Sequence, residues 1–244
     1  MKYILLLSLM TYFLSASSQS DSQKEAQKII DKVIKKHGGK KYKDAHYEYD
    51  FRKHHFTYHF DDGLYQYERY DQATDTKDRL TNEGLVRYRA GKLLKLNAKE
   101  NKSISGVVNS VHYFAFLPYF LNDAAVHKDL IGTGTIKGKE YYKIKVTFDE
   151  EGGGQDYEDI YIYWFNKKDL TLDYLAYSFH VNGGGVRFRS SYNRRTVNGI
   201  IFQDYINYKH DKSTPVEDLD RYYDSGELIE LSRIELKNIK EIAG

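Results

Sequence analysis

The chain has 244 residues, of which 41% are hydrophobic, with 24 Tyr and 12 Phe but no Cys. This length and content suffice for one large β domain, whose pleated, half-buried sheets accommodate aromatic rings well. A formal net charge of +2 without a basic stripe argues against a nucleic-acid partner, and the lack of Cys excludes disulfides.

An apolar run over residues 3–14 follows Lys2 and precedes small polar residues at 15–18. The run is too short to span a bilayer, which takes about 20 residues, and its flanks are typical of a secretory leader. We therefore predict a signal peptide over residues 1–18, with a buried N-terminal helix as the alternative, and a single domain over 19–244. No later segment is apolar enough to cross a membrane, so the mature protein is expected to be periplasmic or secreted, without a lipidated Cys.

The domain is expected to begin with an amphipathic helix. Ser22 and Glu25 have the spacing of a capping box, and Gly38-Gly39 supplies a left-handed stop. Between them, apolar residues fall on one helical face, namely Ala26, Ile29, Ile30, Val33 and Ile34. The opposite, Lys-rich face is interpreted as a solvated surface.

From Ala45 the apolar residues alternate in twos, which is typical of β-strands. The pattern continues to residue 89, with turns at Asp61-Asp62-Gly63, at 82–84 and at 90–91. Short strands joined by tight turns must lie beside one another in antiparallel order, because a parallel crossover takes a dozen or more residues.

A helix and an aromatic segment interrupt the strands at residues 103–126. Ser105 is predicted to cap a helix from Gly106 to about Phe116, which Pro118 ends. This stretch is too apolar to lie in water, so we expect it to cover one face of the sheet as a lid.

Five more alternating runs follow, at residues 142–148, 160–165, 175–181, 186–192 and 200–208. Gly-rich or Asn-Gly turns separate them, which predicts a second stretch of antiparallel meander. Residues 211–224 are typical of a loop, and 228–239 of a closing strand in preference to a short helix. The predicted fold is mainly β (α+β): a curved antiparallel meander, or half-barrel, with an N-terminal helix and a helical lid packed on its concave face.

Several blocks of this sequence are distinctive: Asn109-Ser110-Val111, Leu117-Pro118, Leu121-Asn122-Asp123, Glu151-Gly152-Gly153-Gly154, Asp173-Tyr174-Leu175-Ala176-Tyr177 and Arg187-Phe188-Arg189. They resemble an uncharacterised family of exported proteins from Bacteroidetes-type bacteria, a resemblance that implies no activity and no functional residue. The order of helix, meander, helical lid and meander is similar to the lipoprotein carrier, or outer-membrane lipoprotein sorting, superfamily. That similarity implies a half-barrel that shelters acyl chains, although the many Tyr residues depart from a plain aliphatic lining.

Two groups of residues could offer metal ligands. Acidic residues gather around three glycines in segment 149–159, but they lack the spacing of a calcium loop and are interpreted as a solvated turn. His55 and His59 share a strand face but lie roughly 13 Å apart, too far for one metal ion. Nothing in the sequence brings His46 or His112 to them. We therefore expect no metal and no cofactor.

Arg187 and Arg189 point the same way on one strand, so they could clamp a carboxylate or phosphate headgroup. The preferred interpretation instead pairs them with Glu158 or Asp173 across the sheet, because charged cross-strand pairs are common. If the sheet encloses an anionic amphiphile, the two arginines are its expected headgroup contacts.

The lid and the sheet contribute a set of aromatic residues, namely Tyr113, Phe114, Phe116, Tyr119, Phe120, Tyr163 and Trp164. They either form ordinary core or line a concave apolar cavity, the usual form of a small-ligand site. Nucleophilic catalysis has no supporting motif, because the chain has no Cys and no G-x-S-x-G elbow.

The leading hypothesis is an exported, non-enzymatic envelope protein that binds a hydrophobic or amphiphilic ligand, such as a lipid or acyl chain. Its partners would be that ligand and, as a second option, another envelope protein. The predicted ligand-binding residues are Tyr113, Phe116, Tyr119, Phe120, Tyr163, Trp164, Arg187 and Arg189. Two alternatives stay open: a hydrolase-like enzyme with a carboxylate–histidine site, tested at Asp156 or His112, and an interaction protein with a filled core and an exposed sheet edge.

Overall fold

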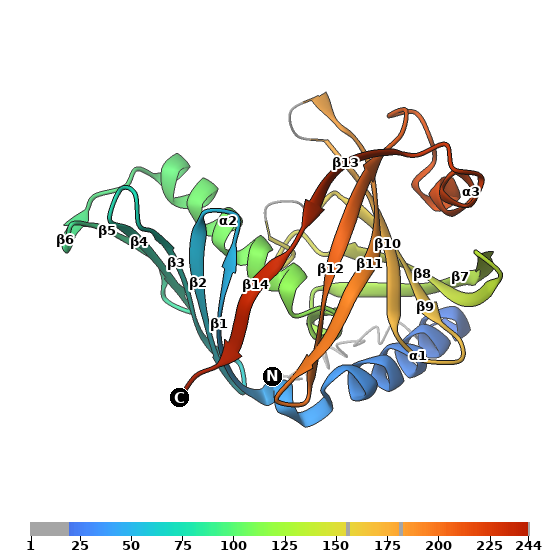
Figure 1. Ribbon diagram of the computed structural model, residues 1–244, viewed down its shortest axis with the longest axis horizontal. Coiled ribbons are helices and arrows are strands. Elements are labelled where there is room, and N and C mark those ends of the chain that lie inside the picture. The colour runs from blue at the N-terminus through green and yellow to red at the C-terminus, as the bar shows by residue number, and fades with distance from the viewer. Residues whose placement is uncertain (1–19, 155–156, 181–182, 244) are drawn as a thin grey trace, which may run out of the picture.

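A computed structural model describes residues 20–154, 157–180 and 183–243. The predicted signal peptide lies outside these residues. The helices are α1 (Asp21–His37), α2 (Ala98–Ala115) and α3 (Leu219–Ser225), with short 3-10 helices η1 (Gly39–Lys43), η2 (Tyr119–Asn122) and η4 (Val216–Asp218). The strands form two antiparallel sheets, with α2 between them (Figure 1).

The first sheet has the strand order β14-β1-β2-β3-β4-β5-β6. Its strands are β1 (Asp44–Phe51), β2 (His54–Asp61), β3 (Leu64–Asp71), β4 (Thr76–Thr81), β5 (Gly84–Arg89), β6 (Lys92–Leu94) and β14 (Leu236–Glu241). The turn predicted at Asp61-Asp62-Gly63 is confirmed, because Asp62 and Gly63 have φ angles of 42° and 101°. Both lie in the left-handed region that tight hairpins require.

The second sheet has the strand order β13-β12-β11-β10-β9-β8-β7. Its strands are β7 (Val126–Ile136), β8 (Lys139–Phe148), β9 (Ile160–Asn166), β10 (Leu172–Phe179), β11 (Gly185–Val197), β12 (Ile200–Lys209) and β13 (Ile229–Ile234). The five predicted runs correspond to β8 to β12. The sequence pattern missed β7, because Gly132 and Gly134 interrupt its apolar alternation.

One segment near the C-terminus belongs to both sheets. β13 pairs with β12, β14 pairs with β1, and Glu235 alone separates the two strands. The closing strand predicted at 228–239 is therefore confirmed, but it is divided between two sheets. The far edges, β6 and β7, do not pair with each other, so the sheets form an open, curved shell around α2 (Figure 1). The predicted fold class is confirmed.

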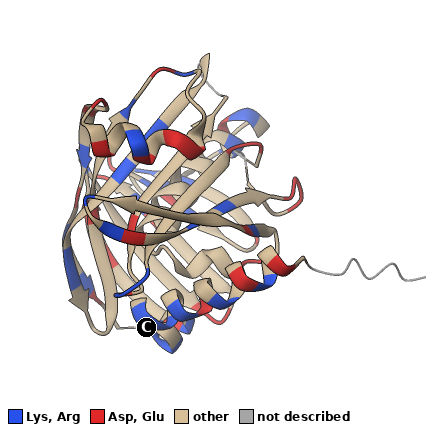
Figure 2. Ribbon diagram, turned by 90° about the vertical axis from the view of Figure 1, so that its right-hand side faces the viewer, with Lys and Arg blue, Asp and Glu red and all other residues tan. Residues whose placement is uncertain are grey.

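α1 begins two residues earlier than the sequence motif indicated. The Ser20 hydroxyl accepts a hydrogen bond from the Gln23 backbone N–H, and the Gln23 side chain accepts one from the Ser20 N–H. The capping box is therefore this pair and not Ser22 with Glu25. The helix ends at Gly38, as predicted. Its apolar face packs against β7, while acidic and basic residues alternate along the helix (Figure 2).

α2 is longer than the predicted helix over residues 106–116. Its N-cap is Asn97, whose side chain accepts from the Glu100 N–H while the Glu100 side chain accepts from the Asn97 N–H. Ser105, the predicted cap, lies inside the helix. The first two turns were missed because their sequence is mostly polar and shows no apolar face.

The main hydrophobic core lies between the two sheets, α1 and α2. A second, smaller core lies on the other face of the second sheet, beneath η4 and α3, and includes Trp164, Phe188 and Leu219. Residues 211–224, predicted as a loop, thus contain a short helix that starts at a fully buried Leu219. β9 is buried on both faces, which explains why apolar residues occupy both positions of its alternation.

Candidate functional site

A cavity of about 780 Å³ lies between the two sheets and is bordered by α2. Ligand pockets in proteins have volumes of roughly 300–1,000 Å³. The cavity walls come from the β1–β2 turn with nearby residues of β2 and β3, one face of α2, the inner faces of β9 to β12, and the β13–β14 junction. Most of the lining side chains are aliphatic or aromatic.

Local periodicity explains how each wall is built. On α2, Val107, Val111 and Phe114 recur every three or four residues and therefore lie on one helical face. On β11, Arg187 and Arg189 are two residues apart and so point into the same cavity. The prediction that these two arginines share a face is confirmed.

Arg189 is a buried cation in this largely apolar wall, with only 9% of its surface exposed. The Cζ atom of its guanidinium lies 4.2 Å from the ring centroid of Phe114 and 5.2 Å from that of Tyr177. Its Nη2 donates to the Tyr177 hydroxyl at 3.1 Å, whereas its Nε has no hydrogen-bond acceptor within the described residues. A buried charge that lacks an opposite charge is costly to the fold.

Arg187 also lines the cavity but is half-buried. Its Cζ lies 4.7 Å from the ring centroid of Phe179, and Nη1 donates to the Val186 carbonyl at 2.8 Å. The preferred interpretation, in which Glu158 or Asp173 pairs with these arginines, is wrong, because neither carboxylate forms an ion pair with Arg187 or Arg189 among the described residues. Asp173 binds Arg194 at 2.7 Å, because the strand register places Leu175 and Tyr177 opposite the two arginines.

Three other charged groups of the lining have charged partners, whereas the exposed Arg52 contacts the ring of Phe51. Arg69 and Lys53 each bind an aspartate of the first sheet, at 2.6 Å and 3.3 Å. Asp159 lies 3.8 Å from the Nδ1 atom of His180. Among the described residues, Arg187 and Arg189 form no ion pair with a carboxylate. The lining therefore contains more cationic side chains than carboxylates, and among the described residues its buried cation without an ion pair is Arg189 of the second sheet.

The predicted lid aromatics occupy different places. Phe116 is fully buried in the main core, and Tyr119 stacks on Tyr42 with ring centroids 4.7 Å apart. Tyr113 and Phe120 stack at 5.5 Å and line a second cavity of about 300 Å³. Of the aromatic residues at 113–120, Phe114 is the one that lines the large cavity.

Tyr163 and Trp164 cannot line one cavity together, because neighbouring residues on a strand point to opposite faces. Tyr163 is buried in the main core, and Trp164 in the core beneath α3, where its indole Nε1 donates to Asp220 at 3.1 Å. The grouping of Trp164 with the lid is therefore wrong. The strand alternation itself contained the information needed to separate the two side chains.

The acidic segment 149–159 is described only in part, and Asp156 lies outside the described residues. Asp149 binds His127 at 2.7 Å. No cluster of three or more His, Asp or Glu side chains within the described part of the chain is arranged to hold a metal ion.

The histidines form separate, local contacts. Contrary to expectation, the β1–β2 register places His46 opposite His59, with their Nδ1 atoms 2.9 Å apart. His112 is fully buried on α2, and its Nδ1 lies 2.7 Å from the Tyr49 hydroxyl. Burial lowers the pKa of His112 to about 3. Aromatic rings surround its imidazole, among them that of Tyr67, so its surroundings suit a core residue.

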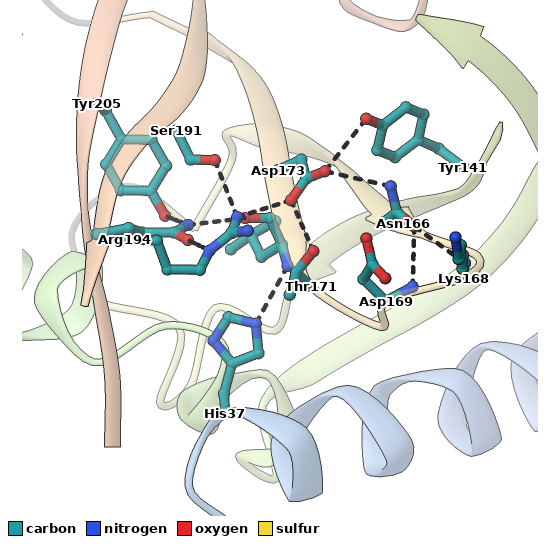
Figure 3. Close-up of polar contacts among 12 residues, drawn as sticks. His37, Tyr141, Asn166, Lys168, Asp169, Thr171, Asp173, Ser191, Arg194 and Tyr205 are labelled. Carbon is teal, nitrogen blue, oxygen red and sulfur yellow. Dashed lines mark hydrogen bonds and ion pairs between the residues drawn. The ribbon is translucent and has the colours of Figure 1, made fainter. Parts of the chain in front are cut away.

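A polar network connects β10, β11 and the end of α1 (Figure 3). Asp173 accepts hydrogen bonds from Arg194, Thr171 and Tyr141 at 2.7, 2.8 and 3.1 Å. The Leu172 backbone N–H donates to Nε2 of His37 at 3.2 Å. These contacts hold strand ends together, so we interpret the network as structural. It reaches the cavity wall where Arg194 donates to Gln203, which in turn donates to the Tyr205 hydroxyl.

Sequence reasoning missed two walls of the cavity. The β1–β2 turn contributes Phe51, and the β13–β14 junction contributes Ile234 and Leu236. Their proximity depends on the pairing of β14 with β1, which joins residues far apart in the sequence. Tyr161 and Tyr177 could have been found, because each has the inward position of its strand alternation.

Comparison with known sequences identifies the family of this chain. No curated protein matches the sequence. The profile of a family of unknown function, DUF6503, matches residues 2–236. The chain belongs to that family. None of the helices that the structure describes for this DUF6503 member is long and apolar enough to cross a membrane.

Several solved structures share the DUF6503 fold at low sequence identity. A LolA superfamily protein from Nitrosomonas europaea is 12% identical, with a TM-score of 0.50 over 89% of this chain and 94% of that one. A DUF1329 family protein from Desulfovibrio piger is 10% identical, with a TM-score of 0.54 over 92% and 95%. A putative outer membrane lipoprotein-sorting protein domain from Vibrio parahaemolyticus is 6% identical, with a TM-score of 0.51 over 91% and 94%. The predicted similarity of fold to the lipoprotein carrier superfamily is confirmed.

Proposed function

We propose that this protein binds a hydrophobic or amphiphilic ligand, such as a lipid or acyl chain, in the cavity between the two sheets and α2. The observation that carries the proposal is a largely apolar cavity of about 780 Å³ in the middle of the fold. The shared fold with a putative lipoprotein-sorting domain supports it by analogy. An interaction protein with a filled core would not need such a cavity.

Binding would bury the apolar part of the ligand against the inner face of α2 and the tyrosines of the second sheet. Phe114 and Tyr161 offer broad rings for this contact, and Arg187 or Arg189 would contact a headgroup. Val107 lies at the cavity near the middle of α2 and is 45% exposed, so a ligand would enter beside this part of the helix.

The test is ligand uptake by the purified protein. Native mass spectrometry should show lipid bound after extraction, or taken up on incubation with a bacterial lipid extract. Replacing Ala115 with Trp would fill part of the cavity and reduce uptake, because Ala115 lines it. Val86→Trp is the matched control, since Val86 lies on β5 at the surface and outside the lining. A clean unliganded mass under all conditions would contradict the proposal.

We further propose that the protein acts in the cell envelope as a single domain over residues 19–244, after removal of a signal peptide over residues 1–18. The support is the apolar run at 3–14 with its small polar flank. N-terminal sequencing of protein from fractionated cells should find a chain that starts near residue 19 in the periplasm or medium. A full-length chain in the cytoplasm would rule this out.

A further inference from the structure

We propose that the cavity selects an amphiphile with one acyl chain and one anionic headgroup, and that Arg189 binds the headgroup. The inference rests on the proposed ligand-binding function and adds the class of ligand. A carboxylate and a phosphate share the relevant chemistry, because both offer two oxygen acceptors in the plane of a guanidinium.

The first argument is that Arg189 has unused hydrogen-bond donors. A guanidinium carries five N–H groups, and within the described residues the side chain of Arg189 makes one hydrogen bond, to the Tyr177 hydroxyl. The side chain is held on the cavity face, because Arg189 pairs with Leu175 on one side and Asn207 on the other, in the middle of the sheet. An anion in the cavity would supply both the missing charge and the missing acceptors.

The second argument is that the guanidinium is held in place before any ligand arrives. Phe114 from α2 and Tyr177 from β10 contact it from two different elements, at 4.2 Å and 5.2 Å. A planar cation fixed against aromatic rings loses little freedom when it binds a carboxylate or phosphate. A lysine at this position would lack both the stacking and the paired donors.

The third argument is size. If a methylene group occupies about as much space as a water molecule in the liquid, ~30 Å³, a chain of 16 carbons needs roughly 500 Å³. The cavity of about 780 Å³ holds one such chain and a small headgroup. Two chains of that length would need roughly 1,000 Å³ by the same measure, and three would exceed the cavity further.

The experiment compares probes that differ in one feature at a time. Delipidated protein is titrated by calorimetry with palmitate, hexadecyl phosphate, 1-hexadecanol and dipalmitoyl phosphatidate, each below its aggregation concentration. Palmitate or hexadecyl phosphate should bind at least about tenfold more tightly than 1-hexadecanol, since hydrogen bonds to a charged group contribute about that much. Whichever of the two acids binds more tightly identifies the headgroup. The two-chain phosphatidate should bind more weakly than hexadecyl phosphate.

Three variants assign the effect to one residue. Arg189→Met should bind the acids no better than the alcohol, Arg189→Lys should recover part of the preference, and Arg187→Met should keep most of it. Equal binding of acid and alcohol by the unaltered protein, or an unchanged preference in Arg189→Met, would overturn the headgroup assignment and leave the proposed ligand-binding function standing. Equal binding of phosphatidate and hexadecyl phosphate would overturn the single-chain assignment. If no probe binds, the proposed function itself fails.

Discussion

Phe116 stacks on Tyr58 with ring centroids 3.6 Å apart and an interplanar angle of 15°. The contact joins the C-terminal end of α2 to the first sheet, and a further ring contact joins Phe116 to Phe202 of the second. This end of α2 is therefore anchored between the two sheets, whereas the opposite end is more exposed.

Replacing Phe116 with Ala should destabilise the protein by about 3–5 kcal/mol. The substitution removes a fully buried ring, and the two sheets cannot both move inward to fill the cavity that it leaves. Urea unfolding followed by circular dichroism measures the change. Phe179→Ala is the matched control. Phe179 is half-buried at the cavity, so its removal should lower the free energy of unfolding much less. Similar losses in both variants would show that α2 is not anchored at Phe116.

Stability should fall as the pH drops below about 6.5. Burial and then the nearby charge of Arg194 lower the pKa of His37 to about 3, and burial lowers the pKa of His112 to about 3. The unfolded chain binds protons near pH 6.5 but the folded chain does not, so acid favours unfolding. Each histidine contributes a slope of up to about 1.4 kcal/mol per pH unit between those values.

The pH dependence is measured as the urea midpoint at pH 7 and pH 5. Glutamine approximates a neutral histidine and cannot titrate, so His37→Gln and His112→Gln should each flatten the dependence. Gln at position 37 can still accept the hydrogen bond from the Leu172 N–H. An unchanged slope in both variants would mean that these imidazoles do not remain neutral in the folded state.

Asp173 and Arg194 should be energetically coupled. Their side chains are 13% and 33% exposed and 2.7 Å apart, and Asp173 also binds Thr171 and Tyr141. A double-mutant cycle with Asp173→Asn and Arg194→Met should give a coupling energy of about 1–3 kcal/mol. The exposed pair Lys28–Glu25 serves as the reference and should show much weaker coupling. Coupling as weak as that of the reference pair would refute a structural role for the network.

Ligand binding should leave the fluorescence of Trp164 almost unchanged. Trp164 is the only Trp of the chain and lies in the core beneath α3, on the face of the second sheet that is turned away from the cavity. Moving the probe to the cavity wall, as Tyr161→Trp in a Trp164→Phe background, should make the emission respond to palmitate. A strong response of Trp164 itself would contradict the assignment of ligand to the large cavity.

Arg189→Met should be at least as stable as the unaltered protein when no ligand is bound. Replacing a buried charge with an apolar side chain of similar length is often neutral or stabilising, although the contact with Phe114 is lost. Thermal unfolding of delipidated samples gives the comparison. A lower midpoint for Arg189→Met than for Arg187→Met would indicate that Arg189 is retained for folding.

The sequence predicted most of the fold because each sheet is a meander, in which neighbours in sequence are neighbours in space. Alternation located β8 to β12, and helical periodicity located α1. The errors occurred where local patterns were weak: the polar start of α2 near Asn97, and β7, whose alternation Gly132 and Gly134 interrupt. The arrangement of the two sheets also depends on β14, which lies near the C-terminus and pairs with β1 near the start of the domain.

The candidate site was predictable only in part. Arg187 and Arg189 could be placed on one face by counting in twos, because a strand has a fixed period. The partners of the two arginines could not be predicted. Whether they contact Asp173 or aromatic rings depends on the register of β10 against β11 and on the position of α2. The lid residues were predicted as one set, but the helix ends at Ala115, and the chain beyond it enters the core.

Glu235 is the single residue between β13 and β14, and the residues on either side of it, Ile234 and Leu236, both face the cavity. Any rotation of one sheet relative to the other must pass through the backbone at this position, so it works as a hinge. The width of the cavity and the dihedral angles of Glu235 are therefore one mechanical coordinate. A Pro or Gly at position 235 would stiffen or loosen ligand entry without altering a side chain of the wall.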